Sequence, residues 1–333
     1  MEHHILYLFR RTSRFFSIEN VFNRIIEEIK RQKDLVPERA VVPKEGFSIP
    51  VIWANGRFAR RQKTDIFHIT GDIHYVSFFL PRKRTVLTIH DCVFMYRSSG
   101  IKRWVLKKVF LDWPVARCRQ VTTISENTKR DILKFTGCPS DAIRVIPNPV
   151  SDKIIFGPKP FTADKPVLLF IGSTPNKNLP RAIEALKDIP CILDIVGEIP
   201  APQKMELEKA GIVYRNFLNL TDEEMAARYT ASDIVFFPST YEGFGMPIIE
   251  GQKAGRPVIT SDLSPMKEVA GGGACLVDPF SPDSIRDGLI KIVKDNVYRE
   301  TLVKKGLENV QNYELGHIAG IYHALYQEIL KEV

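Results

Sequence analysis

The sequence has 333 residues, of which 44% are hydrophobic and 26% are charged, a composition typical of globular proteins and unlike that of disordered or fibrous chains. Its longest apolar runs fall far short of the ~20 residues that a membrane-spanning helix needs, and the first run, 5–9, is too short for a signal peptide. We therefore expect a cytoplasmic protein, and its length predicts two domains. The five cysteines show neither metal-ligand nor redox spacing, so we interpret them as reduced structural thiols.

The net charge of +8 is unevenly distributed along the chain. Residues 1–158 contain 28 Lys and Arg against 15 Asp and Glu, whereas residues 159–333 contain 19 against 24. A basic first half attracts anionic partners such as a phosphorylated lipid, a membrane surface or a nucleic acid. A basic face that is merely solvated explains the charge equally well.

In the first half, short β-branched runs alternate with helical stretches, which is the pattern of a parallel sheet covered by helices. Ser17 is expected to cap a helix that runs to about Lys33, because apolar residues recur there at helical spacing. The expected strands are 4–9, 65–70, 85–90, 120–125 and 143–146.

Three parts of the first half are candidates for function. His90 ends the strand at 85–90, where active sites of such sheets gather, although a histidine there is also common in cores, and His74 is its rival. Residues 10–16 contain three arginines that suit an acceptor phosphate or a solvated loop: Arg10, Arg11 and Arg14. Residues 101–113 would suit a membrane surface, but we favour core packing for the face that holds Ile101, Val105, Val109 and Trp113.

A segment rich in proline and glycine, 147–160, predicts a boundary between domains 1–158 and 159–315. After it, strands and helices alternate in doubly wound order. The expected strands are 167–171, 192–196, 212–214, 234–237, 257–260 and 274–277.

Two loops of the second half carry the strongest chemical pattern. One follows the strand at 167–171 and contains Lys177. The other follows the strand at 234–237 and places Glu242 and Glu250 eight positions apart, with glycines at 243 and 245 between them. Glycine lets backbone approach a ligand, and the N–H groups of the helix start that follows point at an anion.

These residues resemble the retaining glycosyltransferases of family 4, also called group 1. The resemblance is carried by Glu242 and Glu250 with seven residues between them, by Ala254-Gly255-x-Pro257-Val258 and by Val277-Asp278-Pro279. It implies an α/β chain of two Rossmann-like, doubly wound domains that face each other across a cleft, the GT-B type. The domain 1–158 would bind the acceptor, 159–315 the nucleotide sugar, and the last helix, 316–333, would pack back toward the first domain.

The resemblance also implies roles for individual residues. Glu250 would hold the donor ribose, Lys177 the diphosphate, and His90 would lie near the transferred sugar. The implied catalytic residues are Glu242, His90 and Lys177. The implied donor-binding residues are Gly172, Ser173, Lys177, Asn178, Gly243, Phe244, Gly245, Met246 and Glu250. Relatives have an arginine where this chain has Ser173, so Arg256 or a basic residue of the first domain is expected to replace it.

The sequence has no Asp-x-Asp motif, which predicts a site with no metal and no other cofactor. The predicted function is therefore a retaining, metal-independent hexosyl transfer from a nucleotide sugar to a saccharide or lipid-linked acceptor in cell-surface polysaccharide synthesis. Peripheral contact with the inner, anionic face of a membrane is expected, and a nucleic-acid partner is not, since no aromatic-basic recognition motif occurs. The alternative is a non-catalytic nucleotide-sugar binding module of the same fold.

Overall fold

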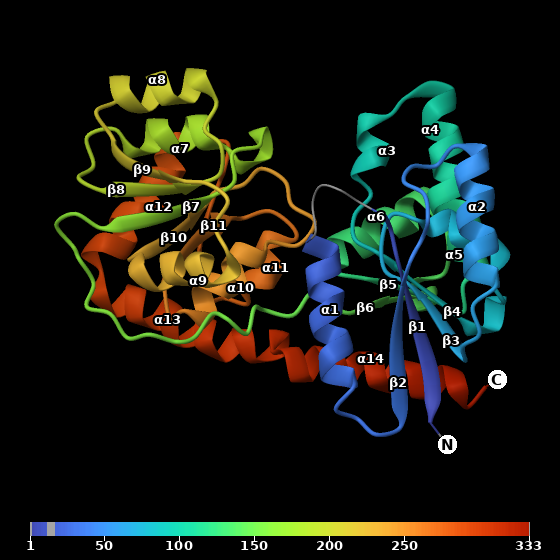
Figure 1. Cartoon of the computed structure of the whole chain (residues 1–333). Helices are drawn as coiled ribbons and strands as arrows, with labels where there is room; N and C mark the ends of the chain where they lie inside the picture. Colours follow the sequence, from blue (N-terminus) through green and yellow to red (C-terminus); the bar gives the residue numbers. More distant parts are fainter. Residues whose placement is uncertain (1, 12–16, 333) are drawn as a thin grey trace. The chain divides into compact units, whose positions relative to one another are not determined.

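The computed structural model describes residues 2–11 and 17–332, and it contains two compact units (Figure 1). Unit 1 comprises Met1–Pro149 and Leu315–Val333, and unit 2 comprises Val150–Glu314. Each unit has its own parallel six-stranded sheet with helices packed on it. The expected cap at Ser17 lies outside the described side chains.

The sheet of unit 1 has the strand order β2-β1-β3-β4-β5-β6, and all of its strands are parallel. The strands are β1 (His3–Phe9), β2 (Leu35–Val41), β3 (Ile66–Ile69), β4 (Thr85–Ile89), β5 (Gln120–Thr123) and β6 (Ile143–Val145). The helices are α1 (Ser17–Ile29), α2 (Ile49–Arg60), α3 (Val93–Arg97), α4 (Gly100–Lys107), α5 (Trp113–Arg117), α6 (Glu126–Thr136) and α14 (Leu315–Leu330).

Unit 2 repeats this architecture with the order β12-β11-β10-β7-β8-β9. Its strands are β7 (Val167–Ile171), β8 (Ile192–Val196), β9 (Val213–Phe217), β10 (Ile234–Phe237), β11 (Val258–Ser261) and β12 (Cys275–Val277). Its helices are α7 (Leu179–Leu186), α8 (Ala201–Lys209), α9 (Asp222–Ala231), α10 (Met246–Lys253), α11 (Met266–Ala270), α12 (Pro282–Lys294) and α13 (Asn296–Val310). The strand order reverses between β7 and β10, and doubly wound sheets bind ligands outside the carboxyl ends of the strands at such a reversal. We call this edge of the sheet, beside the loops that follow β7 and β10, the crevice of unit 2.

The expected strands of both halves are confirmed to within a few residues. The sequence interpretation missed β2, which lies at the edge of its sheet and contains Pro37, Glu38 and Arg39. An edge strand tolerates proline and charge because one side of it forms no ladder hydrogen bonds. Its pattern therefore resembles a loop.

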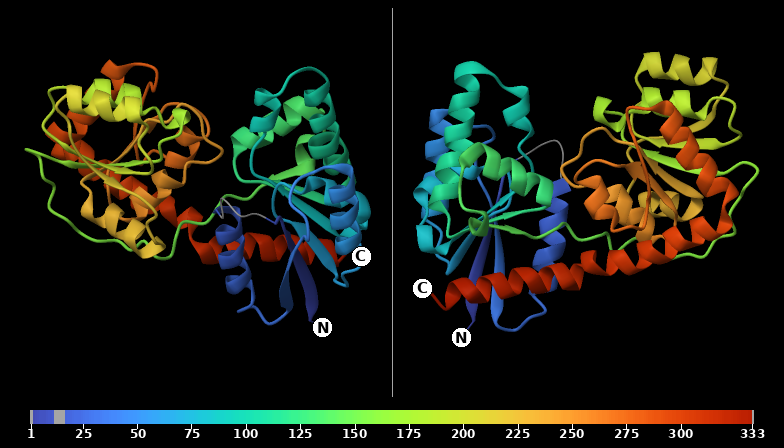
Figure 2. Two further views of the ribbon diagram at one scale, coloured as in Figure 1. Left: turned by 45° about the horizontal axis from the view of Figure 1, so that its top comes forward. Right: turned by 180° about the vertical axis from the view of Figure 1, so that it is seen from behind.

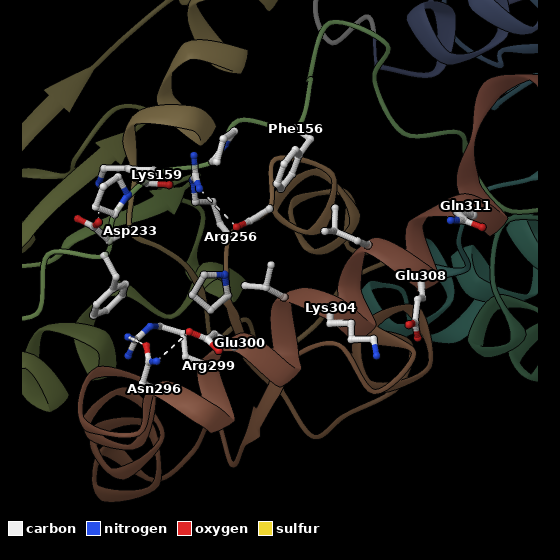
Figure 3. A pocket seen from close by; sticks show the side chains of 18 residues that line it. Phe156, Lys159, Asp233, Arg256, Asn296, Arg299, Glu300, Lys304, Glu308 and Gln311 are labelled. Atoms are coloured by element: carbon white, nitrogen blue, oxygen red, sulfur yellow. Dashed lines mark hydrogen bonds and ion pairs between the residues drawn. The ribbon is translucent and has the colours of Figure 1, made fainter.

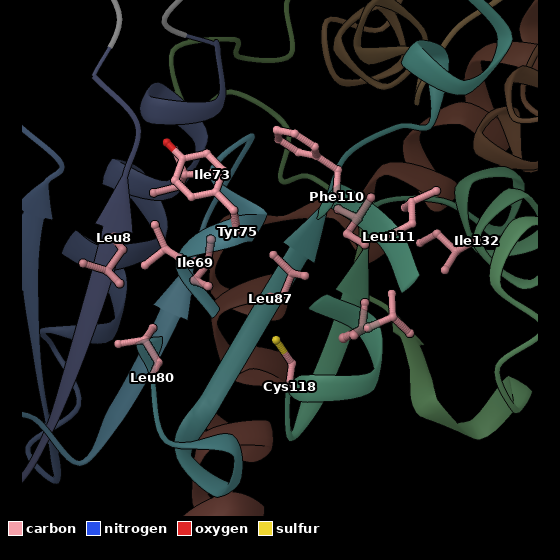
Figure 4. Packing of buried hydrophobic residues seen from close by; sticks show 14 of the residues in the cluster. Leu8, Ile69, Ile73, Tyr75, Leu80, Leu87, Phe110, Leu111, Cys118 and Ile132 are labelled. Carbon is pink, nitrogen blue, oxygen red and sulfur yellow. The ribbon is translucent and has the colours of Figure 1, made fainter. Parts of the chain in front are cut away.

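One face of the unit 1 sheet is covered by a core of aliphatic and aromatic side chains (Figure 4). Leu8, Ile69 and Leu87 project from neighbouring strands, and Phe110 and Leu111 pack over them. All five side chains are buried. Burying an aliphatic side chain of this size contributes roughly 1.5–3 kcal/mol, so this layer stabilises the sheet of unit 1.

The core-packing interpretation of residues 101–113 is wrong for part of its face. Ile101, Val105 and Trp113 are exposed, and the core takes Leu106 and Phe110 instead. Lys108–Asp112 forms a turn of π-helix between α4 and α5, and such a turn rotates the side chains that follow it relative to those before it. The sequence pattern assumed a regular helix throughout.

The last helix, α14, belongs to unit 1 and packs against α1 (Figure 2). The hydroxyl of Tyr326 on α14 lies 2.7 Å from Nδ1 of His68 and donates to Tyr7 Oη at 2.9 Å. The other ring nitrogen of His68 lies 2.7 Å from Thr88 Oγ1. All of these groups are buried, so the network ties the end of the chain to β1, β3 and β4.

Candidate active site

The loop after β7 places a lysine at the crevice of unit 2. Gly172 has φ +88°, a conformation that favours glycine, and a Cβ at this position would lie 2.9 Å from Cε of Lys177. The stem of Lys177 therefore rests on Gly172. Its ammonium lies 4.8 Å from the centre of the Phe237 ring, at the end of β10. The glycine thus sets the direction in which the lysine points.

Lys177 meets Glu242, which comes from the loop after β10. Nζ lies 2.7 Å from Oε1 of Glu242, and both side chains are largely buried. Asn176 Nδ2 also donates to Oε1, at 3.3 Å, and the Ser239 hydroxyl lies 2.6 Å from it. All of these contacts meet Oε1, so within residues 2–11 and 17–332 Oε2 of Glu242 is left to accept a hydrogen bond from a ligand.

Asn178 joins the two loops from inside. It adopts φ +69°, is buried, and donates through Nδ2 to Pro238 O at 3.0 Å and to Pro279 O at 2.6 Å. Its Oδ1 accepts from Arg181 at 3.0 Å. These bonds engage both amide hydrogens and one lone pair of the oxygen, so the side chain of Asn178 holds the loop in place. Its donor-binding role stays a prediction.

Gly243, Phe244 and Gly245 lead into α10, which begins at Met246. Gly245 has φ +111° at the cap, Pro247 lies in the first turn, and the first N–H groups of a helix have no partner within it. Phe244 is buried and packs edge-on against Tyr313, with ring centres 5.8 Å apart. Phe244 therefore anchors the loop by its side chain and offers a ligand only its backbone.

Glu250 lies one turn inside α10 and has a partner that the sequence interpretation missed. The hydroxyl of Tyr229, on α9, donates a short hydrogen bond to Oε2 of Glu250. Tyr229 is fully buried, and burial together with the Glu250 charge raises its pKa well above the ordinary value. The tyrosine stays protonated and fixes the orientation of the carboxylate.

Ser173, which stands where relatives have an arginine, is half-buried beside Gly197 at the end of β8.

Arg256 does not replace the missing arginine. It precedes β11, at the amino ends of the strands, whereas the two loops leave from the carboxyl ends. Its guanidinium is buried and donates to backbone oxygens of Gly157, at 2.7 Å, and Thr230, at 2.9 Å. Arg256 lines a separate groove of about 640 Å³ with Lys159, Asp233 and α13 (Figure 3). The expectation for Arg256 is therefore wrong.

The sheet of unit 1 reverses its strand order between β1 and β3, and a cavity of about 600 Å³ lies beside the loops that follow these strands. His74 lines this cavity, and its Nδ1 lies 2.6 Å from Phe110 O. A carbonyl accepts only, so Nδ1 carries the proton and Nε2 is an acceptor. Burial lowers the pKa of His74, which keeps the ring neutral.

His90, the predicted catalytic histidine, is not among the residues that line this cavity. Its Nε2 lies 2.8 Å from Thr70 O, which leaves Nδ1 as the acceptor, and burial lowers its pKa. The structure therefore places its rival, His74, at the cavity wall.

The arginines of the first loop differ in their contacts. Arg10 pairs with Glu19 at 3.0 Å and with Asp72, whereas Arg11 donates to Pro43 O at 3.2 Å. Both line the cavity of unit 1. Arg14, which the sequence also singled out, lies outside the described residues.

In the part of the chain that is described, no helix is long and apolar enough to cross a membrane.

Two family profiles match the chain over its two halves. The profile described as Glycosyltransferase Family 4 matches residues 6–153, and that described as Glycosyl transferases group 1 matches residues 151–309. Among curated proteins, the O-antigen chain mannosyltransferase B of Escherichia coli is 25% identical over 271 residues, which are 72% of this chain and 70% of that protein. The O-antigen chain mannosyltransferase RfbU of Salmonella typhimurium is 29% identical over 64% of this chain and 62% of its own length.

Solved structures show the same fold. The Anabaena protein HepE, in complex with UDP and glucose, superposes with a TM-score of 0.80 at 15% identity, over 98% of this chain and 100% of that one. Sucrose-phosphate synthase from Thermosynechococcus elongatus gives a TM-score of 0.78 at 17% identity over the whole of both chains.

Proposed function

The chain belongs to the group 1, family 4 glycosyltransferases, with the two-domain GT-B fold, and we propose that it moves a hexose from a nucleoside diphosphate sugar to a saccharide or lipid-linked saccharide. The observation that most directly supports this proposal is the contact between Lys177 and Glu242 at the crevice of unit 2. One loop supplies a cation for a diphosphate, and the other supplies a carboxylate oxygen for a sugar hydroxyl. Relatives named O-antigen mannosyltransferases support mannose as the hexose and cell-surface polysaccharide synthesis as the process.

The donor would lie with its ribose on Glu250 and its diphosphate between Lys177 and the first turn of α10. Glu250 accepts only, which suits the two hydroxyls of a ribose, and Tyr229 holds it in place. The amino end of a helix carries partial positive charge and attracts a phosphate. HepE was solved with UDP and glucose, which supports a nucleoside diphosphate sugar as the donor class.

The reaction breaks the bond between the sugar and the departing diphosphate. Negative charge then grows on the phosphate oxygen, and Lys177 with the N–H groups at the start of α10 would stabilise it without a metal ion. The acceptor hydroxyl would attack from the face that the phosphate leaves, which retains the configuration at the sugar, and the phosphate oxygen would take its proton. The cavity of unit 1 would hold the acceptor. The protein would be cytoplasmic and attached to the inner face of a membrane.

A panel of nucleoside diphosphate hexoses tests this proposal. The protein is incubated with each donor, with and without a lipid-linked saccharide, and release of the nucleoside diphosphate is measured. One donor should release its nucleotide slowly in water and faster with acceptor, and the product should keep the donor's anomeric configuration by NMR. Donor binding without any release would contradict the proposed transfer and support a binding module.

Chelation tests metal independence separately. EDTA should leave the rate unchanged, because Lys177 and the helix start are proposed to neutralise the leaving group. Loss of activity that magnesium or manganese restores would overturn this part of the proposal while leaving sugar transfer intact.

A further inference from the structure

His74, in the wall of the unit 1 cavity, uses only one of its two ring nitrogens within the protein. It begins a short 3-10 helix, His74–Phe79, and is 3% exposed. Its Nδ1 lies 2.6 Å from Phe110 O, to which it donates. Within residues 2–11 and 17–332, no group hydrogen-bonds to Nε2. This nitrogen is therefore available to accept a hydrogen bond from a ligand.

A proline explains why the carbonyl of Phe110 accepts from His74. In a regular α-helix this carbonyl would accept from the N–H of residue 114, but residue 114 is proline and has no N–H. Phe110 also lies in the π-helical turn Lys108–Asp112, and its ring packs against that of His74, 5.7 Å between centres. The helix thus provides the partner of Nδ1, and this partner determines which nitrogen of His74 carries the proton.

The other nitrogen, Nε2, reaches the cavity. Among the described residues, three buried side-chain atoms have no hydrogen-bond partner: Oε2 of Glu19, Oγ of Ser77 and Oε1 of Gln203. Nε2 of His74 also has no partner but is not one of these enclosed atoms, so it keeps contact with solvent. His74 lines the cavity and is otherwise buried, so this contact is made through the cavity.

The rest of the cavity wall suits a saccharide. Phe47, Phe94 and Phe110 all line it, and the ring centres of Phe47 and Phe94 lie 5.5 and 6.0 Å from that of Phe110. Apolar rings beside a few placed polar groups match a pyranose, which has an apolar C–H face and a set of hydroxyls. The volume of about 600 Å³ is typical of small-molecule sites.

The neutral ring of His74 favours a hydroxyl over a phosphate as its partner. Burial lowers the pKa of His74, so Nε2 carries a lone pair and no proton. A fully ionised phosphate has only acceptor oxygens and forms no hydrogen bond with such a nitrogen, whereas a hydroxyl donates to it.

We propose that Nε2 of His74 accepts a hydrogen bond from one hydroxyl of the acceptor saccharide, which makes His74 a determinant of acceptor specificity. This inference rests on the proposed function, which assigns the cavity to the acceptor. An analogue that lacks the hydroxyl leaves Nε2 without a partner in a dry site, so the site rejects it. The role differs from that predicted for His90, which does not line the cavity.

Two substitutions of His74 separate this role from mere support of the wall. In His74→Asn the short amide still donates to Phe110 O, but no atom reaches the position of Nε2. In His74→Gln the longer side chain brings an amide oxygen, which accepts, to that position. Acceptor affinity should fall about two- to tenfold in His74→Asn and stay within about twofold in His74→Gln. Normal affinity in His74→Asn with weakened affinity in His74→Gln would overturn the proposal.

The control is His317→Asn, which should leave acceptor affinity unchanged. His317 is an exposed histidine on α14 and does not line the cavity.

Methyl glycosides of mannose, glucose and N-acetylglucosamine are the probes, added to protein that contains ¹⁵N-labelled histidine. The Nε2 resonance of His74, identified by its loss in His74→Asn, should move toward the position of a protonated nitrogen when a glycoside binds. One monodeoxy form of that glycoside should bind wild type roughly tenfold more weakly, yet bind His74→Asn as well as its parent does. No movement with any glycoside, or the same deoxy penalty in both proteins, would overturn the proposal.

Transfer kinetics distinguish this inference from the proposed function. Release of nucleotide from the donor in water should be equal in wild type, His74→Asn and His74→Gln, whereas the Michaelis constant for the acceptor should rise in His74→Asn. Glycoside binding at His74 without transfer from any donor would refute the proposed transfer alone. Transfer with an unchanged acceptor Michaelis constant in His74→Asn would refute the role of His74 alone.

Discussion

Nζ of Lys177 lies 2.7 Å from Oε1 of Glu242, and this pair joins the loops that follow β7 and β10. The two residues are 65 positions apart and meet because the strand order reverses between their strands. The stem of Lys177 packs against Gly172. Ser239 and Asn176 both donate to the carboxylate oxygen that contacts the lysine, Oε1 of Glu242. The charges at the crevice are therefore oriented before any ligand binds, which is the condition for electrostatic catalysis.

Lys177→Ala should lower the turnover number far more than donor affinity. The lysine is proposed to act mainly on charge that develops as the donor bond breaks, and such a contact raises the rate rather than the affinity. A loss of about 100-fold or more is expected, as for other groups that stabilise developing charge. Steady-state kinetics with the preferred donor measure it, with Lys304→Ala as the control. A raised Michaelis constant with normal turnover would show that Lys177 only binds.

Gly172→Ala should damage catalysis by displacing Lys177. Its Cβ would lie 2.9 Å from Lys177 Cε. Gly211→Ala is a matched control, since Gly211 also has positive φ, +66°, but its Cβ would have nothing within 4 Å. Both variants should lose roughly 1 kcal/mol of stability from backbone strain, measured by denaturant unfolding. Only Gly172→Ala should lose activity, and equal activity in the two would refute the support that Gly172 gives the lysine.

Glu250→Ala should weaken donor binding, whereas Glu250→Gln should do less harm because an amide oxygen still accepts. Tyr229→Phe should fall between them, since it frees the carboxylate from its hydrogen bond without removing it. A hydrogen bond to a charged carboxylate contributes roughly 1.5–3 kcal/mol, so a loss of about this size is expected in Glu250→Ala and a smaller loss in the other two variants. Calorimetric titration with the nucleoside diphosphate measures all three. Unchanged affinity in Glu250→Ala would refute its ribose role.

Unit 1 should lose stability as the pH falls below about 6.5. Burial lowers the pKa of His68 from 6.5 to about 3, and it also lowers those of His74 and His90. Above pH 6.5 the ring of His68 is neutral in both the folded and the unfolded state, so its titration does not change the free energy of unfolding there. Between 6.5 and 3 the unfolded chain binds a proton that the folded chain does not, and each pH unit costs up to about 1.4 kcal/mol.

Tryptophan fluorescence in urea measures this effect, because all three tryptophans of the sequence lie in unit 1. His68→Gln keeps a hydrogen-bonding side chain that does not titrate, so its unfolding free energy should fall less steeply between pH 7 and 5. Parallel pH profiles in the two proteins would contradict the neutral state of His68.

The sequence predicted the strands well because parallel strands are buried on both faces and therefore contain long apolar runs. It also predicted that Lys177 and Glu242 lie in loops that directly follow two strands, and the family resemblance implied that both act with Glu250 on the donor. It missed Tyr229, which precedes Glu250 by 21 residues on another helix and has no pattern that distinguishes it from a core tyrosine. It misassigned Arg256 because distance along the chain does not show which edge of the sheet a residue occupies. It also assigned the exposed Ile101 to a core face, and it did not predict the π-helical turn at Lys108–Asp112, which apolar periodicity does not reveal.

The most direct test of the account is a transfer assay with the preferred nucleoside diphosphate hexose in wild type, Glu242→Ala and Glu300→Ala. Glu300 lines the groove at the amino ends of the strands, so its variant is the control. The account predicts normal transfer in Glu300→Ala and a loss of about tenfold or more in Glu242→Ala, because the sugar loses a hydrogen bond to a charged group that contributes roughly 1.5–3 kcal/mol. Normal transfer in Glu242→Ala would show that sugar is not moved at the crevice beside Lys177, and would contradict the account.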